Sequence, residues 1–187
     1  MKYVYEILFC FLCCGIIGWV YETIFVLFQS GRMTDRGILF ISHIHGYPFI
    51  WGLPLILIYG IGGAALIWGF KPLANKPVLL FLISMATMTL FEYVTAVFCE
   101  LVLGQTLWDY SKEFMNFQGR ICLRASISWG ILGILAVKVF GPLFHLIYNK
   151  IKYVRVLHII IIVLVIYVLI CYFLRATLFP DMVAHMA

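Results

Sequence analysis

Five long runs of apolar residues separated by short polar links constrain the fold of this chain more than any other feature. An α-helix needs about 20 mainly apolar residues to cross the hydrocarbon core of a bilayer. The runs cover residues 3–28, 47–70, 77–103, 121–140 and 156–176. They predict an all-α integral membrane bundle of about five transmembrane helices, with residues 1–187 forming a single transmembrane domain.

The composition agrees with a chain that uses lipid as its main solvent. Hydrophobic residues make up 65% of the 187 residues and charged residues only 11%, whereas soluble domains carry roughly 25% charged residues. Segment 143–155 mixes apolar residues with His145, Lys150, Lys152 and Arg155. That mixture is typical of a helix lying in the membrane interface, here just before the last span.

The basic residues flank the apolar runs, which is how lysine and arginine orient membrane helices. The net charge is +5, and no polar segment combines a basic run with aromatic residues, so nucleic acid is not an expected partner. The first run is too long for a signal peptide and has no small-residue cleavage site before Glu22, so we expect a retained helix. The bases in the links favour a cytoplasmic N-terminus and an external C-terminus.

The cysteines and histidines do not form a metal or redox motif. Most of the six cysteines lie in apolar runs, and the Cys10-x-x-Cys13 pair lacks polar neighbours, so packing is the favoured role. His43 and His45 are too few for a metal site. We therefore expect no metal and no cofactor.

Ionisable residues gather at one end of the predicted bundle, because antiparallel helices bring alternate ends to the same side. Glu22, Glu92 and Glu100 lie late in the first and third helices, and Arg124 begins the fourth. Placing a charge in hydrocarbon costs about 2.5–3.5 kcal/mol even on the lenient insertion scale, which favours pairing or a polar cavity. The predicted polar cluster comprises Glu22, Arg32, Arg36, Glu92, Glu100, Trp108, Asp109, Tyr110, Asn116, Arg120 and Arg124.

Simpler interpretations exist for each part of this cluster. Glu22, Glu100 and Arg124 lie near helix ends and could reach water along their flexible stems. Glu92 lies too deep for that, so it is either one half of a structural ion pair or part of a pathway or ligand site. The aromatic residues of segment 104–120, including Trp108 and Tyr110, could form an interfacial belt.

A series of short elements is found from the third helix onward, namely Phe91-Glu92-Tyr93-Val94-Thr95, Glu100, Leu107-Trp108-Asp109-Tyr110-Ser111, Asn116, Gly119-Arg120-Ile121-Cys122-Leu123 and Ser128-Trp129-Gly130. In these elements the chain resembles a bacterial family of multi-pass membrane proteins labelled Putative ABC-transporter type IV, or ABC transporter permease-like, and the resemblance covers roughly Gly15 to Gly141. Gly18-Trp19 with Glu22, and Arg36-Gly37-Ile38-Leu39, also look like the first helix and link of that family. The link that follows, at 42–52, departs from the family pattern.

The resemblance implies a component of membrane transport in a bacterial plasma membrane. The chain contains no Gly-x-x-x-x-Gly-Lys-[Ser/Thr] phosphate loop, so an ABC permease of this kind would need a separate cytosolic ATPase subunit. Five helices make a small translocation path, so a homo-oligomer is a further expected partner. The lipid bilayer is the third expected partner.

Three hypotheses stay open at the level of sequence. The first is a transport component, possibly the permease subunit of an ABC-type transporter, whose polar cluster lines a vestibule or gate. The second is a membrane-embedded enzyme or binder acting on a lipid headgroup or other amphipathic substrate, with Glu92, Asp109 and Tyr110 as acid/base candidates. The third is a structural or accessory subunit. No nucleophile–base pair is visible, which disfavours an enzyme without excluding one.

Overall fold

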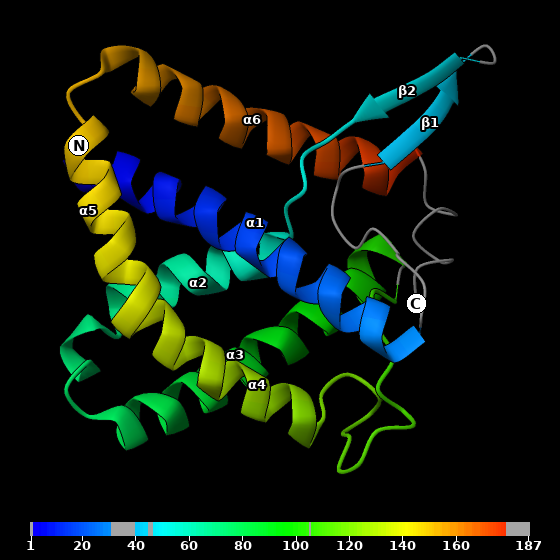
Figure 1. The fold of residues 1–187 in the computed structure, drawn as a ribbon. Coiled ribbons are helices and arrows are strands. Elements are labelled where there is room, and N and C mark those ends of the chain that lie inside the picture. The colour runs from blue at the N-terminus through cyan, green and yellow to red at the C-terminus, as the bar shows by residue number, and fades with distance from the viewer. Residues whose placement is uncertain (1, 31–39, 45–46, 105, 179–187) are drawn as a thin grey trace. The chain divides into compact units, whose positions relative to one another are not determined.

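The computed structural model describes residues 2–30, 40–44, 47–104 and 106–178. Its elements are α1 (Lys2–Ser30), β1 (Phe40–Ile44), β2 (Tyr47–Trp51), α2 (Leu57–Gly69), a 3₁₀ turn η1 (Lys71–Leu73), α3 (Pro77–Phe98), a π-helical turn η2 (Cys99–Leu103), α4 (Leu123–Leu135), a second π-helical turn η3 (Ala136–Phe140), α5 (Gly141–Ile151) and α6 (Arg155–Leu178). Figure 1 labels the α-helices and strands along the chain.

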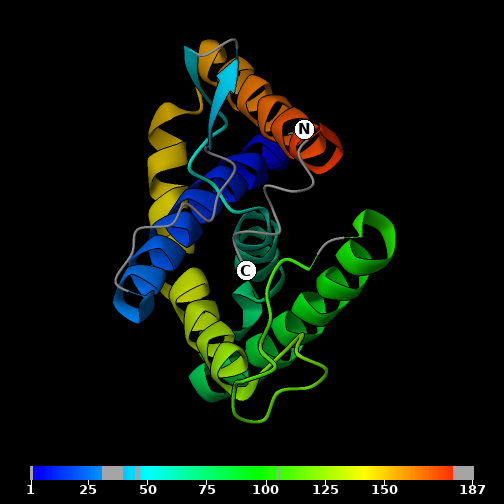
Figure 2. The same cartoon turned by 90° about the vertical axis from the view of Figure 1, so that its right-hand side faces the viewer.

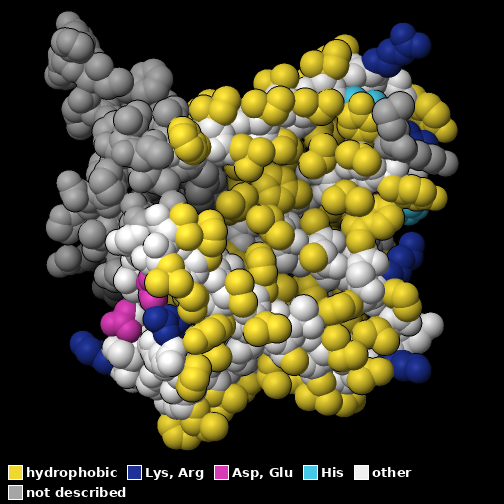
Figure 3. All heavy atoms as spheres, turned by 180° about the vertical axis from the view of Figure 1, so that it is seen from behind, with side chains coloured by type: hydrophobic (Ala, Val, Ile, Leu, Met, Phe, Trp, Pro, Cys, Tyr) yellow, Lys and Arg dark blue, Asp and Glu magenta, His cyan; other side chains and the backbone are white. Residues whose placement is uncertain are grey.

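The predicted all-α membrane bundle is confirmed. Among the described residues, three helices are long and apolar enough to cross a bilayer, namely Tyr3–Phe28, Pro77–Val102 and Leu123–Ile151. Leu57–Gly69 and Arg155–Cys171 are shorter apolar helices. Hydrophobic side chains cover most of the described surface seen in Figure 3, as expected for a chain in contact with lipid.

The predicted helix over 47–70 begins later than expected. Residues 47–51 form β2, which pairs antiparallel with β1 and places Pro48 opposite His43, and the helix starts only at Leu57. Pro48 and Pro54 explain the delay, because proline has no backbone N–H and disfavours helical geometry at the residue before it. In a two-stranded sheet every strand is an edge strand, so a proline is tolerated there.

The predicted end of the fourth helix at residue 140, just before Gly141-Pro142, does not separate two helices. α4 continues through η3 into α5, and the Gly141 N–H bonds to the Ala136 carbonyl five residues earlier. A proline ring clashes with the carbonyl four residues before it in a regular α-helix. The wider π-helical turn directly before Pro142 is where the helix accommodates that ring. Interfacial placement of segment 143–155 stays a prediction.

The chain divides into two compact units by its internal contacts, and each is described separately. The first combines Met1–Ala64 with Phe144–Phe179, and the second contains Ala65–Leu143. In the first unit α1 packs closely against the segment leading into α2 and against α2 itself. A Cβ built on Gly15 would lie 2.5 Å from Leu55 Cγ, and one on Gly18 would lie 2.3 Å from Tyr59 Cβ. These glycines therefore permit the close approach that their spacing predicts.

The second unit is built on the packing of α3 against α4. α3 buries one residue in every four, a stripe that consists of Leu80, Ser84, Met88, Glu92 and Ala96. On α4, a Cβ at Gly130 would lie 2.5 Å from Phe81 Cε2, and one at Gly133 would lie 2.3 Å from Ser84 Cβ. Small residues thus bring the two helices together along the same stripe that carries Glu92.

Candidate functional site

Glu92 is the buried centre of the candidate site. It lies on α3 and is only 4% exposed. Its Oε1 accepts a hydrogen bond of 3.0 Å from the Tyr110 hydroxyl, and its Oε2 accepts one of 3.0 Å from the indole N–H of Trp129. Tyr110 comes from the loop 104–122 and Trp129 from α4, so three separate segments converge on one carboxyl group.

The loop 104–122 begins and ends on well-defined caps. Gly104 has a left-handed φ of +64° and its N–H bonds to the Cys99 carbonyl, which ends η2. At the other end Cys122 is the N-cap of α4, and its Sγ accepts from the Ala125 N–H at 3.5 Å. Figure 2 shows the loop that joins α3 to α4, in green to yellow-green.

The two arms of this loop are bonded to each other. The Trp108 indole N–H donates to the Arg120 carbonyl at 2.8 Å, and the Tyr110 N–H donates to the Gly119 carbonyl at 2.7 Å. These bonds place Tyr110 beside α3. The Trp-Asp-Tyr-Ser and Gly-Arg-Ile-Cys-Leu elements of the sequence are therefore the two arms of one clamp on Glu92.

Asp109 and Asn116 stabilise the turns inside the loop. Asp109 accepts from the Ser111 N–H at 2.8 Å and from the Ser111 hydroxyl at 3.0 Å. These two hydrogen bonds hold the pKa of the Asp109 carboxyl below its usual value. The Asn116 amide donates to the Ser111 and Glu113 carbonyls, at 3.1 and 3.0 Å, and its oxygen accepts from the Gly119 N–H at 3.2 Å. Both side chains thus bond to the loop itself in this structure.

Besides Gly104, three more loop residues have backbone angles that L-amino acids rarely adopt. Met115, Gln118 and Gly119 have φ values of +50°, +54° and +68°. A Cβ at Gly119 would also lie 3.0 Å from Asp109 Oδ1. Non-glycine residues in this region are strained, and such strain is often found at functional sites.

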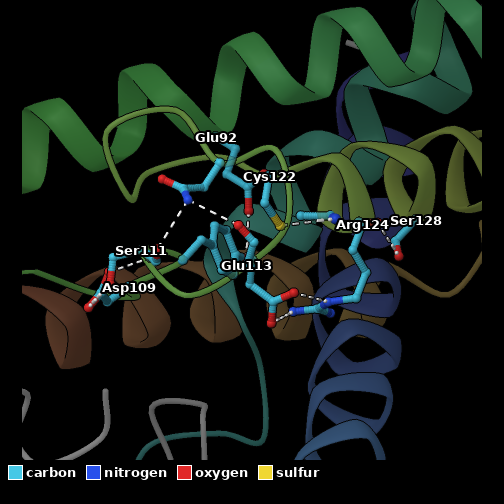
Figure 4. A network of polar contacts seen from close by, with 10 residues as sticks. Glu92, Asp109, Ser111, Glu113, Cys122, Arg124 and Ser128 are labelled. Carbon is cyan, nitrogen blue, oxygen red and sulfur yellow. Dashed lines mark hydrogen bonds and ion pairs between the residues drawn. The ribbon is translucent and has the colours of Figure 1, made fainter.

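Two ion pairs connect the loop to the helices. The Arg120 Nη2 lies 2.6 Å from Glu100 Oε2, and Arg120 Nε lies 3.1 and 3.0 Å from the two Glu100 oxygens. Arg124 forms a two-pronged contact with Glu113, at 3.1 Å for each bond. Figure 4 shows Glu113 and Arg124 facing one another, with Asp109 and Ser111 further along the loop.

The ion pairs change the proton affinity of the loop residues. The hydrogen bonds from Arg124 lower the pKa of Glu113, and those to Glu100 raise the pKa of Arg120. Both pairs are partly open to solvent, so they orient side chains more than they stabilise the fold. Arg120 also stacks over the Tyr93 ring, with its guanidinium carbon 5.8 Å from the ring centroid.

Eight of the eleven predicted residues lie in the second unit. They are Glu92, Glu100, Trp108, Asp109, Tyr110, Asn116, Arg120 and Arg124. Glu22 belongs to the first unit, where its carboxylate accepts a hydrogen bond from the Tyr59 hydroxyl. Arg32 and Arg36 lie outside the described residues. Of the expected acid–arginine pairings, Glu100 with Arg120 is observed, whereas Arg124 binds Glu113.

Sequence reasoning missed Trp129 and Glu113 as members of the cluster. Trp129 is 6% exposed, and a buried indole N–H normally has an acceptor. A tryptophan on the fourth helix and a glutamate deep in the third helix were therefore the sequence signal that could have indicated this hydrogen bond. Nothing comparable in the sequence shows that Glu113 is the partner of Arg124.

Both Glu92 oxygens accept hydrogen bonds from neutral groups, the Tyr110 hydroxyl and the Trp129 indole, and a carboxyl group in this setting can exchange a proton. Opening the loop would remove the Tyr110 donor. Within the described residues no three histidine, cysteine or acidic side chains are grouped as a metal ion would require.

Comparison with known proteins supports the family suggested by the motifs. The model of the family described as Putative ABC-transporter type IV matches residues 9–174, which include the clamp and all five apolar runs in whole or in large part. No curated protein and no solved structure matches the chain. The chain is therefore a membrane protein that belongs to the family described as Putative ABC-transporter type IV.

Proposed function

We propose that the chain is the membrane-spanning component of a transporter, the permease subunit of an ABC-type system, and that Glu92 with the loop 104–122 forms its gate. The observation that carries this proposal is the burial of the Glu92 carboxyl group on a spanning helix, under hydrogen bonds from two other segments. Ionisable groups inside membrane helices are costly, and the usual reason for keeping one is a role in a substrate, ion or proton pathway.

The gate opens by movement of the loop. Tyr110 is bonded both to Glu92 through its hydroxyl and to Gly119 through its N–H, so it couples the loop to the carboxyl group. When the loop moves away, the carboxyl group loses one donor and becomes accessible to a cationic or hydrogen-bonding substrate. Trp129 stays on α4 and keeps the carboxyl group oriented.

The energy for transport comes from a separate ATPase subunit in this proposal, because the chain has no phosphate-binding loop. In this proposal the chain crosses the plasma membrane of a bacterial cell several times with its N-terminus in the cytoplasm, the orientation that the bases in the links favour. Segment 143–155, with Lys150 and Lys152, then faces the cytosol and is the proposed contact for the ATPase. A homo-oligomer supplies a translocation path that five helices are too few to form alone.

The alternative of an enzyme acting on a lipid headgroup has less support. Two of its acid/base candidates have structural partners, since Asp109 bonds to Ser111 and Tyr110 bonds to Glu92. No observation on the described residues places a nucleophile beside a base at this cluster.

The test replaces Glu92 with glutamine, which keeps the size and the hydrogen-bonding oxygen but removes the charge. Vesicles that contain the chain and its copurified ATPase are supplied with a cell extract, and ATP-dependent solute uptake is compared by mass spectrometry. We expect Glu92→Gln to abolish uptake while membrane insertion is unchanged.

Glu6→Gln is the matched control. Glu6 is also a buried glutamate on a spanning helix, at 8% exposure, but it bonds to His145 in the first unit. The control should retain uptake. Wild-type uptake by Glu92→Gln would remove Glu92 from the mechanism, and equal loss in both variants would point to a general requirement for buried carboxyl groups.

A further inference from the structure

We infer that the second unit carries a binding site for one phospholipid of the surrounding bilayer, with an acyl chain in a groove between α3 and α4 and the phosphate beside Arg120. The groove has a volume of about 450 Å³. Its lining includes Met85, Ala86 and Tyr93 on α3, Ser126 on α4 and Phe117 of the loop. This inference holds whether or not the chain transports a substrate.

The depth of the groove matches one leaflet of a membrane. Tyr93 and Met85 both line the groove and are eight residues apart on α3, which is about 12 Å along a helix axis. One leaflet of a bilayer has a hydrocarbon depth of about 15 Å, half of the full core. Because the groove runs from the loop into a spanning helix, it follows the direction of a lipid tail.

The walls have the chemistry of a tail site. The groove is lined almost wholly by apolar surface, and Leu90, which also lines it, is 63% exposed. An apolar hollow on a spanning helix is filled by hydrocarbon in a membrane, since water has no polar partners there. The loop residues Phe117 and Ile121 also line the groove, so the tail would contact more protein than it does on an open helix face.

Two polar residues of the loop, Gln118 and Arg120, contact Tyr93, which lines the groove, and we take this side as its mouth. The Tyr93 hydroxyl donates to Gln118 Oε1 at 2.9 Å, and the Arg120 guanidinium stacks over the same tyrosine ring. Arg120 has five N–H donors. Its contacts to Glu100 and Gln118 use three of them, and its side chain is 26% exposed.

An anionic phosphate is the headgroup feature that fits this mouth. The planar guanidinium binds phosphate oxygens through paired N–H groups. Arg120 also has a hydrogen bond with Tyr93, so one of its five N–H donors remains for a phosphate oxygen while the contact with Glu100 persists. A tail in the groove and a phosphate at the loop together describe a phospholipid rather than a free fatty acid or a free phosphate ion.

The experiment counts lipids retained by the full chain. The protein is reconstituted in vesicles of dioleoylphosphatidylglycerol and dioleoylphosphatidylcholine in equal amounts, extracted in mild detergent and examined by native mass spectrometry. The wild type should retain phosphatidylglycerol in preference to phosphatidylcholine, because both carry a phosphate but the choline cation beside it is repelled by Arg120. Ala86→Trp and Leu90→Trp fill the groove from exposed positions on α3 and should reduce the retained lipid about tenfold.

Thr87→Trp is the matched control, because Thr87 is exposed on α3 but does not line the groove. It adds the same bulk and should leave retention unchanged. Equal retention by the wild type and both groove variants would overturn the tail site, and so would equal loss in Thr87→Trp.

The headgroup contact is tested with Arg120→Gln and Arg120→Lys. The glutamine variant should still retain lipid but lose the preference for phosphatidylglycerol, whereas the lysine variant should keep most of it. An unchanged preference in Arg120→Gln would overturn the phosphate assignment and leave a tail site without headgroup recognition.

Discussion

The indole N–H of Trp129 donates to the Glu92 carboxylate at 3.0 Å, across thirty-seven positions of sequence. Both side chains are buried, at 6% and 4% exposure. The bond connects α3 and α4 at the level where the loop 104–122 also reaches Glu92 through Tyr110. The same contact thus contributes to helix packing and to the orientation of the proposed gate.

Trp129→Phe should destabilise the protein by about 1–3 kcal/mol, because it leaves a buried carboxyl oxygen without this donor. Thermal unfolding in detergent measures the loss. The double variant with Glu92→Gln completes a mutant cycle, and we expect a coupling energy between the two positions. Strictly additive effects would show that the bond makes no net contribution.

Gly119→Ala should distort the loop more than Gly104→Ala does. Both glycines have φ near +65°, at +68° and +64°, so alanine costs roughly 1–2 kcal/mol of backbone strain at either position. Only at Gly119 would the new Cβ also meet a side chain, at 3.0 Å from Asp109 Oδ1, whereas at Gly104 nothing lies within 4 Å. Hydrogen exchange of loop amides compares the two variants. Equal protection in both would contradict the role of the Asp109 contact.

Acid should loosen the loop 104–122. Hydrogen bonds lower the pKa values of Asp109 and Glu113 in the folded protein, so the stabilisation is complete above the ordinary carboxyl pKa of about 4. It is lost as the pH falls through the lowered values, because the unfolded loop then binds protons more readily. Fluorine NMR of fluorotryptophan at Trp108, assigned with Trp108→Phe, follows this transition.

Asp109→Asn is the control for the acid transition. An asparagine can still accept a hydrogen bond from the Ser111 N–H but does not titrate, so the transition should become shallower. An unchanged acid profile in this variant would assign the transition to other carboxyl groups.

The two loops flanking α3 should react from opposite sides of the membrane. Cysteines introduced at Ser111 and Asn75, on a background without native cysteines, are labelled with an impermeant maleimide in intact cells. With a cytoplasmic N-terminus we expect Ser111→Cys to react from outside and Asn75→Cys only after permeabilisation. The reverse result would place the loop 104–122 in the cytosol and make it the natural contact for an ATPase.

Much of the helical fold was predictable because hydrophobic length is a local property of the sequence. The spans at 3–28 and 77–103 correspond closely to α1 and to α3 with η2. The start of α2 and the continuous path through Gly141-Pro142 were not predictable, because they depend on how prolines are accommodated by a hairpin and by a π-helical turn. The single-domain organisation stays a prediction, since the contacts divide the chain into two units.

From the amino-acid sequence alone it follows that ionisable residues gather late in the third helix and early in the fourth, since helix parity places them on one side. It also follows that Glu92 lies too deep in an apolar run to reach water along its own side chain. The partners of these residues depend on the three-dimensional fold. Glu92 receives hydrogen bonds from a tyrosine and a tryptophan, and Arg124 meets Glu113. These partners follow from the path of a loop with four left-handed residues, Gly104, Met115, Gln118 and Gly119, and apolar periodicity carries no information about that path.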